Sequence, residues 1–123
     1  MYKFRVPLLP ISVNSMYKYN FGNKTKYLSE EARHFKFALK LACPPMSFST
    51  PNPRLFVMIE YHSPTWICKN GNVRKKDGMN MDKLVFDSVA EKIGIDDSRI
   101  FKWSGIKVLS EEEFTEITVE EII

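Results

Sequence analysis

Residues 54 to 62, with the sequence RLFVMIEYH, form the segment that most constrains the fold. Its side chains alternate, and both alternating faces are largely apolar: Leu55, Val57, Ile59 and Tyr61 on one face, Phe56 and Met58 on the other. A strand that is apolar on both faces needs neighbours to cover it. The pattern therefore predicts a central strand, and the rest of the chain has to supply a sheet around it.

Two segments have the 3.6-residue period of an amphipathic helix. The first begins after Ser29, a favourable N-cap, and is expected to end near Ala42, before a pair of prolines. The second ends at Gly94, a residue suited to the positive φ of a helix C-terminus. Its apolar face comprises Met81, Leu84, Val85, Ser88 and Val89.

Three further segments alternate in the manner of strands, namely residues 2–7, 99–108 and 114–121. In the second of them Ile100, Trp103, Ile106 and Val108 are expected to be buried, with a bulge at Ser104-Gly105. Residues 10–20 have no such period and are interpreted as a loop. The order β-α-β-α-β-β predicts one domain over residues 1–123. We expect an α+β fold with two layers, a mixed or antiparallel sheet and two helices.

The charge is distributed unevenly along the chain. The first 110 residues hold all 18 Lys and Arg and nine of the 15 acids, so their net charge is +9. The last 13 residues hold the other six acids. A basic body favours a polyanionic partner, because neutralising phosphates releases counterions, although a solvated basic surface has the same charge.

Two broad classes of protein fit the sequence poorly. No apolar run reaches the roughly 18 residues of a membrane helix, so we expect no membrane association. Cys43 and Cys68 lie in unrelated contexts without metal-ligand spacing. Free thiols in a reducing cytoplasm explain them most simply, so a cytoplasmic location is expected.

Acidic residues flank the second helix. Asp77 and Asp82 lie at its start, Asp97 lies just past its end, and Lys83 follows in the first turn. Carboxylates beside a lysine are typical of divalent-metal chemistry on phosphate. An Asp at a helix start is also a common cap, and Asp-Asp-Ser after Gly is a common turn, so spacing alone leaves both interpretations open.

Two stretches combine features of nucleic-acid contact. The loop before Asp77 carries Lys69, Arg74, Lys75 and Lys76, and charge of this sign suits a phosphate backbone. Near the N-terminus, aromatic residues that include Tyr17 alternate with lysines, as in surfaces that stack bases. Both stretches also fit ordinary solvated loops, and the alternatives stay open at this point.

Several of these residues together resemble the signature of the RusA family of Holliday junction resolvases. In that family a basic residue precedes Asp-x-Asp-Asn, a Lys follows in the first helical turn, and Asp-Asp-Ser comes after the helix. The matching residues here are Lys76, Asp77, Asn80, Lys83, Asp96 and Asp97, with Ser12 and Asn14 in an N-terminal motif. One position departs from the pattern, since Met79 stands where the family has its second acid.

The resemblance implies a Mg²⁺-dependent homodimeric endonuclease, with Mn²⁺ as another possible ion, that resolves four-way DNA junctions in recombination and repair. Asp77 and Asp97 would hold the metal, Asp82 would replace the missing acid, and Lys83 would stabilise charge on the phosphate. The residues expected to contact DNA are Asn14, Tyr17, Lys69, Arg74, Lys75, Lys76 and Asn80. Glu60 is a candidate for a further acid near the site, although the pattern favours the alternative of an exposed glutamate on the strand. The alternative is a RusA-like protein that binds branched DNA without cutting it, because Met79 removes a ligand.

Overall fold

A computed structural model of residues 1–123 describes the backbone of every residue except 77 and the side chains of all but residues 77–79. The elements follow the chain as β1 (Tyr2–Val6), the 3₁₀ turn η1 (Val13–Ser15), β2 (Tyr17–Asn20), β3 (Thr25–Leu28), α1 (Glu30–Ala42), β4 (Arg54–Ser63), α2 (Gly78–Ile93), the 3₁₀ turn η2 (Asp97–Arg99), β5 (Ile100–Leu109) and β6 (Phe114–Ile122). The predicted α+β class is confirmed, and so is the mixed sheet.

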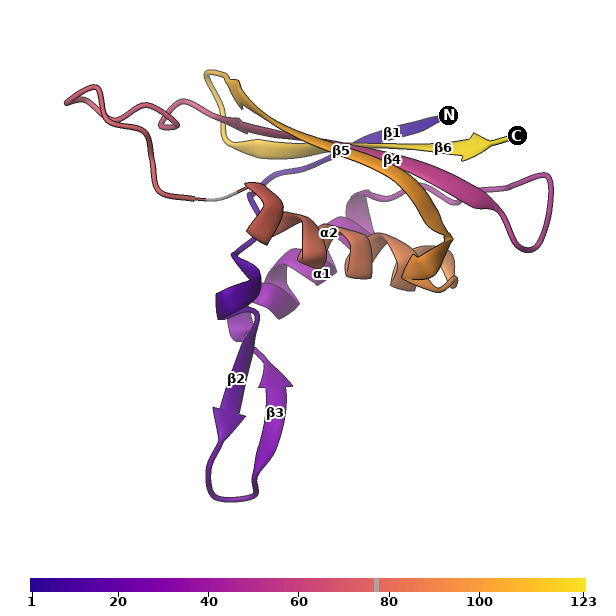
Figure 1. Ribbon diagram of the computed structural model, residues 1–123, viewed down its shortest axis with the longest axis horizontal. Coiled ribbons are helices and arrows are strands. Elements are labelled where there is room, and N and C mark those ends of the chain that lie inside the picture. The colour runs from indigo at the N-terminus through magenta and orange to yellow at the C-terminus, as the bar shows by residue number, and fades with distance from the viewer. Residues whose placement is uncertain (77) are drawn as a thin grey trace.

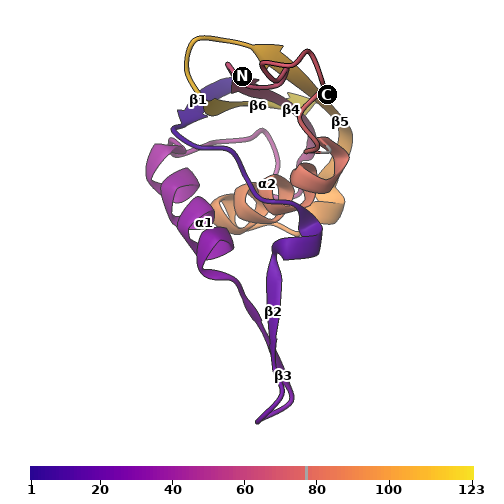
Figure 2. The same ribbon diagram turned by 90° about the vertical axis from the view of Figure 1, so that its left-hand side faces the viewer.

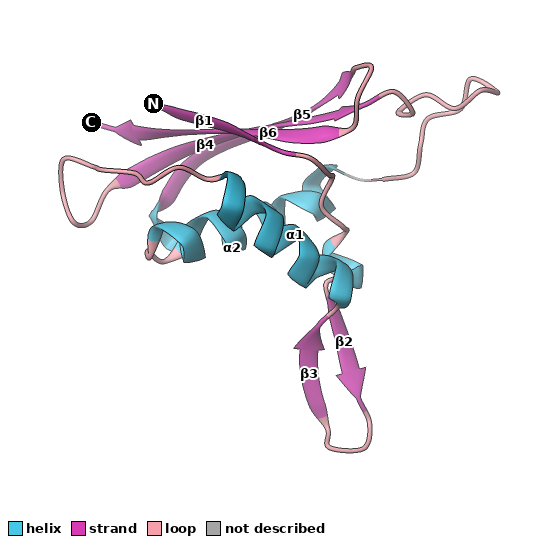
Figure 3. Ribbon diagram, turned by 180° about the vertical axis from the view of Figure 1, so that it is seen from behind, coloured by secondary structure: helices cyan, strands magenta, loops and turns pink. Residues whose placement is uncertain are grey.

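Four strands form one sheet in the order β1-β6-β4-β5, and both long helices cover one of its faces (Figures 1 and 3). Strand β6 is antiparallel to both β1 and β4, whereas β4 and β5 are parallel and joined through α2. The apolar run at residues 54–62 is therefore an inner strand, as predicted. Among the described residues, no helix is long and apolar enough to pass through a bilayer.

The core lies between the sheet and the helices. The predicted side chains of α2 are buried, as is Ala90, and Gly94 has the predicted positive φ of 83° at its end. Helix α1 begins as predicted, because the Ser29 hydroxyl oxygen accepts a hydrogen bond from the Ala32 amide at 3.3 Å. Glu91 of α2 accepts hydrogen bonds from Lys40 and Lys36 of α1, at 2.6 and 2.9 Å. These two lysines lower the pKa of Glu91 to about 2, so the acid stays charged and ties the helices together.

Two predictions about β5 were wrong. Trp103 and Ile106 are 59% and 50% exposed, because β5 is the edge strand of the sheet in the described part of the chain, and Ile106 lies on the face that the helices do not cover. The bulge at Ser104-Gly105 is also absent, since the register shift occurs earlier, between Leu55 and Phe56 on the partner strand. The alternation of apolar and polar residues breaks at Ser104-Gly105 because β5 is an edge strand, and an edge strand need not bury every second residue.

The prediction of a loop over residues 10–20 was also wrong, since a two-stranded hairpin of β2 and β3 begins at Tyr17. The hairpin projects away from both layers (Figures 1 and 2). Seven of its eight strand residues are exposed, so it has no buried face. A strand without a buried face shows no apolar alternation, which is why the sequence pattern did not reveal it.

The acidic end of the chain pairs with the basic body. Strand β6 brings Glu116 beside β1, where Lys3 and Arg5 approach its carboxylate at 3.2 and 3.6 Å. Glu113, just before β6, pairs with Arg74 at 3.2 Å. The uneven charge of the sequence is thus partly neutralised within the sheet.

Candidate nucleic-acid interface and acidic site

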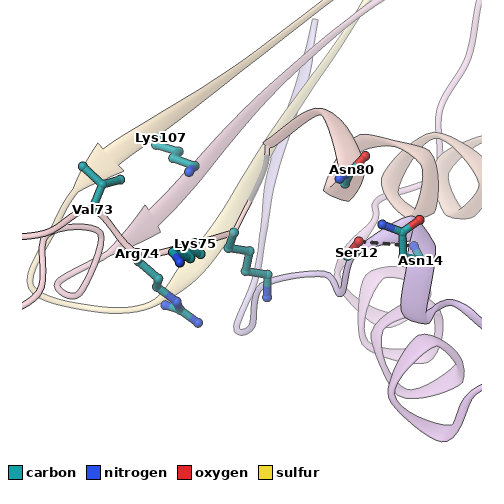
Figure 4. A pocket seen from close by; sticks show the side chains of 8 residues that line it. Ser12, Asn14, Val73, Arg74, Lys75, Asn80 and Lys107 are labelled. Atoms are coloured by element: carbon teal, nitrogen blue, oxygen red, sulfur yellow. Dashed lines mark hydrogen bonds between the residues drawn. The ribbon is translucent and has the colours of Figure 1, made fainter.

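A basic pocket of about 630 Å³ opens at the start of α2 (Figure 4). Four parts of the chain line it: the segment around η1, the loop before α2, the first turn of α2 and the end of β5. The lining residues are Ser12, Asn14, Val73, Arg74, Lys75, Lys76, Asn80 and Lys107. Five of the seven residues predicted to contact DNA are among them, and none of the lining residues is acidic. Four cations around one hollow form a surface that favours a phosphate group.

Arg74 fixes the shape of the loop beside this pocket. Its guanidinium donates hydrogen bonds to Thr65 and Glu113 at 3.0 and 3.2 Å and lies 5.3 Å from the centre of the Trp66 ring. Trp66 is buried, and its indole nitrogen donates to the Tyr61 carbonyl at 2.8 Å. Arg74 therefore anchors the loop, whereas Lys75 and Lys76 form no ion pair among the described residues.

Lys76 is the most enclosed of the pocket lysines. Burial lowers its pKa, and the nearby Arg74 charge lowers it further. A phosphate oxygen in the pocket would compensate both effects by supplying an opposite charge. The Lys76 ammonium thus lies in the pocket without an ion pair to an acid among the described residues.

Lys83 brings two acids together on the outer side of α2. Its ammonium donates to Asp87 at 2.9 Å and to Asp97, on η2, at 3.4 Å. Hydrogen bonding to Asp87, with the charges of both acids, raises the pKa of Lys83. The lysine therefore remains a cation at neutral pH and is suited to stabilise charge, not to accept a proton. The predicted proximity of Lys83 and Asp97 is thus found in the structure.

Asp82 points toward the sheet. The buried Tyr61 hydroxyl donates a hydrogen bond to its carboxylate, and burial together with this bond raises the pKa of Tyr61. Gly105 of β5 lies opposite, where a Cβ atom would be 3.1 Å from Asp82 Oδ1. Because Gly105 has no side chain, the Asp82 carboxylate fits between α2 and β5, and the Tyr61 hydroxyl holds it there.

Helix α2 begins at Gly78, three residues before Met81, where the predicted apolar face starts. Positions 79 and 82 are consequently three apart within one helix and share a side of it. This is the geometry under which Asp82 can stand in for the acid that Met79 replaces. Asp77, the first predicted metal ligand, lies outside the described residues.

One face of β5 orders these groups in space. Trp103, Gly105 and Lys107 pair with residues of β4 that face the helices, at Val57, Ile59 and Tyr61. Trp103 borders a small hollow with Asp97, Gly105 lies against Asp82, and Lys107 lines the basic pocket. Successive members of this row are about 6.6 Å apart along the strand. Asp82 thus lies between Asp97 and the basic pocket.

A second group of possible ligands lies on the other face of the sheet. His62 Nε2 is 2.9 Å from Glu60 and 3.9 Å from Glu116, and the three could hold a metal ion. Lys3 and Arg5 already neutralise Glu116, and the His62 ring stacks on Phe114 at 4.1 Å. Glu60 therefore belongs to a compensated network away from the basic pocket, not to the row on β5.

Three residues of the site were not predicted from the sequence. Lys107 lies in the alternating segment 99–108, which predicts only a strand. Asp87 lies in a stretch of the second helix that resembles the family's helix segment, and that resemblance assigns it no role in the site. Tyr61 was assigned to the core, where it is fully buried, and no sequence signal marks its hydroxyl as a partner of Asp82. The parallel register of β4 and β5 is what brings Lys107 and Tyr61 to the same face.

Comparison with known proteins gives one clear result. The sequence model of the family described as endodeoxyribonuclease RusA matches residues 7–120 of the 123-residue chain. No curated protein sequence matches the chain closely enough to count as a relative. The matched range includes the basic pocket, both long helices and the row on β5.

Proposed function

The chain belongs to the RusA endodeoxyribonuclease family, whose members resolve Holliday junctions, and from this premise we propose that it nicks four-way DNA junctions with a divalent metal ion. The observation that carries the proposal is the basic pocket at the start of α2. Three of its cations, Arg74, Lys75 and Lys76, immediately precede Asp77 in the chain. A resolvase needs a phosphate-binding surface beside acids. The pocket offers that surface, and Asp82 and Asp97, which lie beside the row on β5, are the acids.

The DNA backbone is proposed to lie in the basic pocket. Lys75, Lys76 and Lys107 would neutralise phosphates, while the Asn14 and Asn80 side chains offer amide donors to the same strand. Lys69 lies in the same loop but outside the pocket and would meet phosphates farther along the duplex. Because phosphate contacts carry no sequence information, this surface sets position and leaves sequence preference to other parts of the protein.

The acids of the site fit Mg²⁺, with Mn²⁺ as a substitute. Carboxylate oxygens are the ligands this ion prefers, and it is typically bound through one or two carboxylates with several waters retained. Asp77, Asp82 and Asp97 are the residues proposed to hold it. When bound, such an ion lowers the pKa of water and neutralises charge on the phosphate.

The residues around these acids have supporting roles. Tyr61 orients the Asp82 carboxylate through its hydrogen bond. Lys83, kept protonated by Asp87 and Asp97, would stabilise negative charge that develops on the phosphate oxygens. Recombination and repair are the processes that this activity serves, and the free Cys43 and Cys68 support a reducing cytoplasm as its location.

The test of the proposal is cleavage of a synthetic four-way junction in Mg²⁺ or Mn²⁺, compared with a linear duplex of the same sequence. Symmetrically placed nicks in the junction, and none in the duplex, are expected. Asp77→Asn serves as the inactive control. Binding of the junction without any nick, in either metal, would reject the nuclease and favour the binding protein.

Removing charge from the pocket should flatten the salt dependence of junction binding. Replacing Lys75, Lys76 and Lys107 with glutamine is expected to reduce the slope of log K against log salt by up to about 3 units. Lys102→Gln is the matched control for Lys107→Gln, since Lys102 pairs with Phe56 on the opposite face of β5. If both single variants change the slope equally, the pocket has no special part in binding.

A homodimer is proposed to form along the free edge of β5. This edge strand of ten residues exposes Phe101, Trp103, Ile106 and Leu109. Long apolar edge strands readily pair with another chain, and a two-fold dimer suits a two-fold junction.

Light scattering should give twice the 14.4 kDa chain mass at micromolar concentration, and Ile106→Glu should shift the protein to monomer. Leu41→Glu, at an exposed apolar position of α1, is the control and should leave the mass unchanged. A wild-type protein that is already monomeric would contradict the dimer.

A further inference from the structure

The β2–β3 hairpin, residues 17–28, is here called the aromatic arm. Four of its aromatic side chains are exposed, with Phe21 at the tip 85% exposed and Tyr17, Tyr19 and Tyr27 41–47% exposed. The same residues include Lys18, Lys24 and Lys26 but no acid. So many large apolar groups in solvent, beside uncompensated cations, indicate a binding surface.

Both faces of the aromatic arm carry the same combination. The strand register puts Tyr17, Tyr19 and Lys26 on one face, and Lys18 and Tyr27 on the other. Lys26 lies 4.6 Å from the centre of the Tyr17 ring, and the Tyr19 and Phe21 rings meet edge to face at 4.8 Å. An element with aromatic and basic groups on two faces and at its tip is suited to insert into its partner.

The aromatic arm is anchored to the body at its base, which lies next to the basic pocket. Met16 is fully buried, and its carbonyl accepts a hydrogen bond from the Ser29 amide at 2.7 Å. Asn14, which lines the basic pocket, is only three residues before Tyr17. The arm thus begins beside the surface proposed for the DNA backbone, and from there it projects away from the body (Figure 2).

We propose that the aromatic arm inserts at the branch point of a DNA junction, where Tyr19 and Phe21 stack on unpaired bases and the lysines contact adjacent phosphates. Aromatic rings stack on any base, and lysines follow the backbone beside them. Four extended residues span about 14 Å, so the tip reaches bases roughly four base-pair steps from a phosphate in the pocket. This inference rests on the proposed action on branched DNA, since a regular duplex offers the arm no unpaired base.

A double variant, Tyr19→Ala with Phe21→Ala, tests the inference by comparing affinities for a four-way junction and a linear duplex. Junction binding should weaken at least fivefold, because each stacked base contributes about 1–3 kcal/mol, whereas duplex binding should not change. Phe37→Ala, at a 64% exposed aromatic of α1, is the matched control. In the wild type, 5-iodouracil at the branch point should photocross-link to a peptide within residues 17–28.

The outcomes separate the arm from the enzyme. A wild type that binds junction and duplex equally would reject the proposed function, and the arm's role would fall with it. A wild type that prefers junctions, with a double variant that prefers them equally, would reject the arm alone. If the double variant loses the same affinity for junction and duplex, the arm contacts the DNA backbone in general and the branch-point role is rejected. If the double variant has a different mass from the wild type in light scattering, the arm mediates self-association instead, and the role is likewise rejected. Circular dichroism should be unchanged in the variant, because the replaced rings lie outside the core.

Discussion

Asp97→Asn should slow junction cleavage at least about 100-fold while junction affinity stays within a factor of about two. The substitution keeps the size of the side chain and removes its charge. Asp97 lies 3.4 Å from the Lys83 ammonium and matches the acid that follows the helix in the family signature. Removing a single hydrogen-bond donor that stabilises a transition state typically costs about 10²–10³ in rate, and we expect the loss of a charged group at the reacting phosphate to cost at least as much. Single-turnover cleavage and fluorescence anisotropy measure the two effects.

Asp87→Asn is the matched control, because Asp87 contacts the same lysine at 2.9 Å and the substitution removes the same charge. It should slow cleavage less than about tenfold if Asp97 acts beyond its contact with Lys83. Equal losses in the two variants would mean that both acids only position Lys83. In that case Asp97 would no longer be a candidate metal ligand.

Asp82→Asn should also abolish cleavage, again with junction binding intact, if Asp82 replaces the acid missing at position 79. Its position three residues after Met79 within α2 and its contact with Tyr61 support this role. Tyr61→Phe removes the hydrogen bond but keeps the carboxylate. Because residues that orient metal ligands typically contribute 10–100-fold, this variant should lose about tenfold and regain rate at higher Mg²⁺.

Met79→Asp gives the opposite test of the same position. If the wild-type site is weakened by the missing acid, this substitution should raise activity strongly and Asp82→Asn should have little effect. If Asp82 already fills the role, an added acid should gain little. Should the wild type cut nothing in Mg²⁺ or Mn²⁺ and neither substitution change this, the protein binds junctions without cutting them.

Local patterns predicted most of the fold. The inner strand β4, the cap at Ser29 and the apolar face of α2 followed from alternation and helical period. The hairpin and the exposed face of β5 did not, because neither has a buried side to impose a pattern. Burial in an edge strand depends on which strands lie beside it, and the sequence of that strand alone does not contain this information.

The candidate site was predictable only in part. Lys83 and Asp97 were predicted from the family signature, Asp82 from its place at the start of the helix, and three residues of the pocket from the basic loop. Lys107 and Tyr61 join the site because β4 and β5 are parallel, and their register pairs these two residues although they are 46 positions apart in the chain. Asp77 stays a prediction from the family signature.

The place of β6 in the sheet has a consequence for how the chain reaches this fold. Strand β6 is the last strand in the sequence, yet it lies between β1 and β4, and β1 pairs with no other strand. The Thr115 hydroxyl even donates to the carbonyl of Leu8, 107 residues earlier. During synthesis β1 can therefore pair in the sheet only after β6 has been made, near the end of the chain. The βαβ unit of β4, α2 and β5 can form earlier. Contacts this distant in sequence slow folding, so the step that closes the sheet is expected to limit the rate.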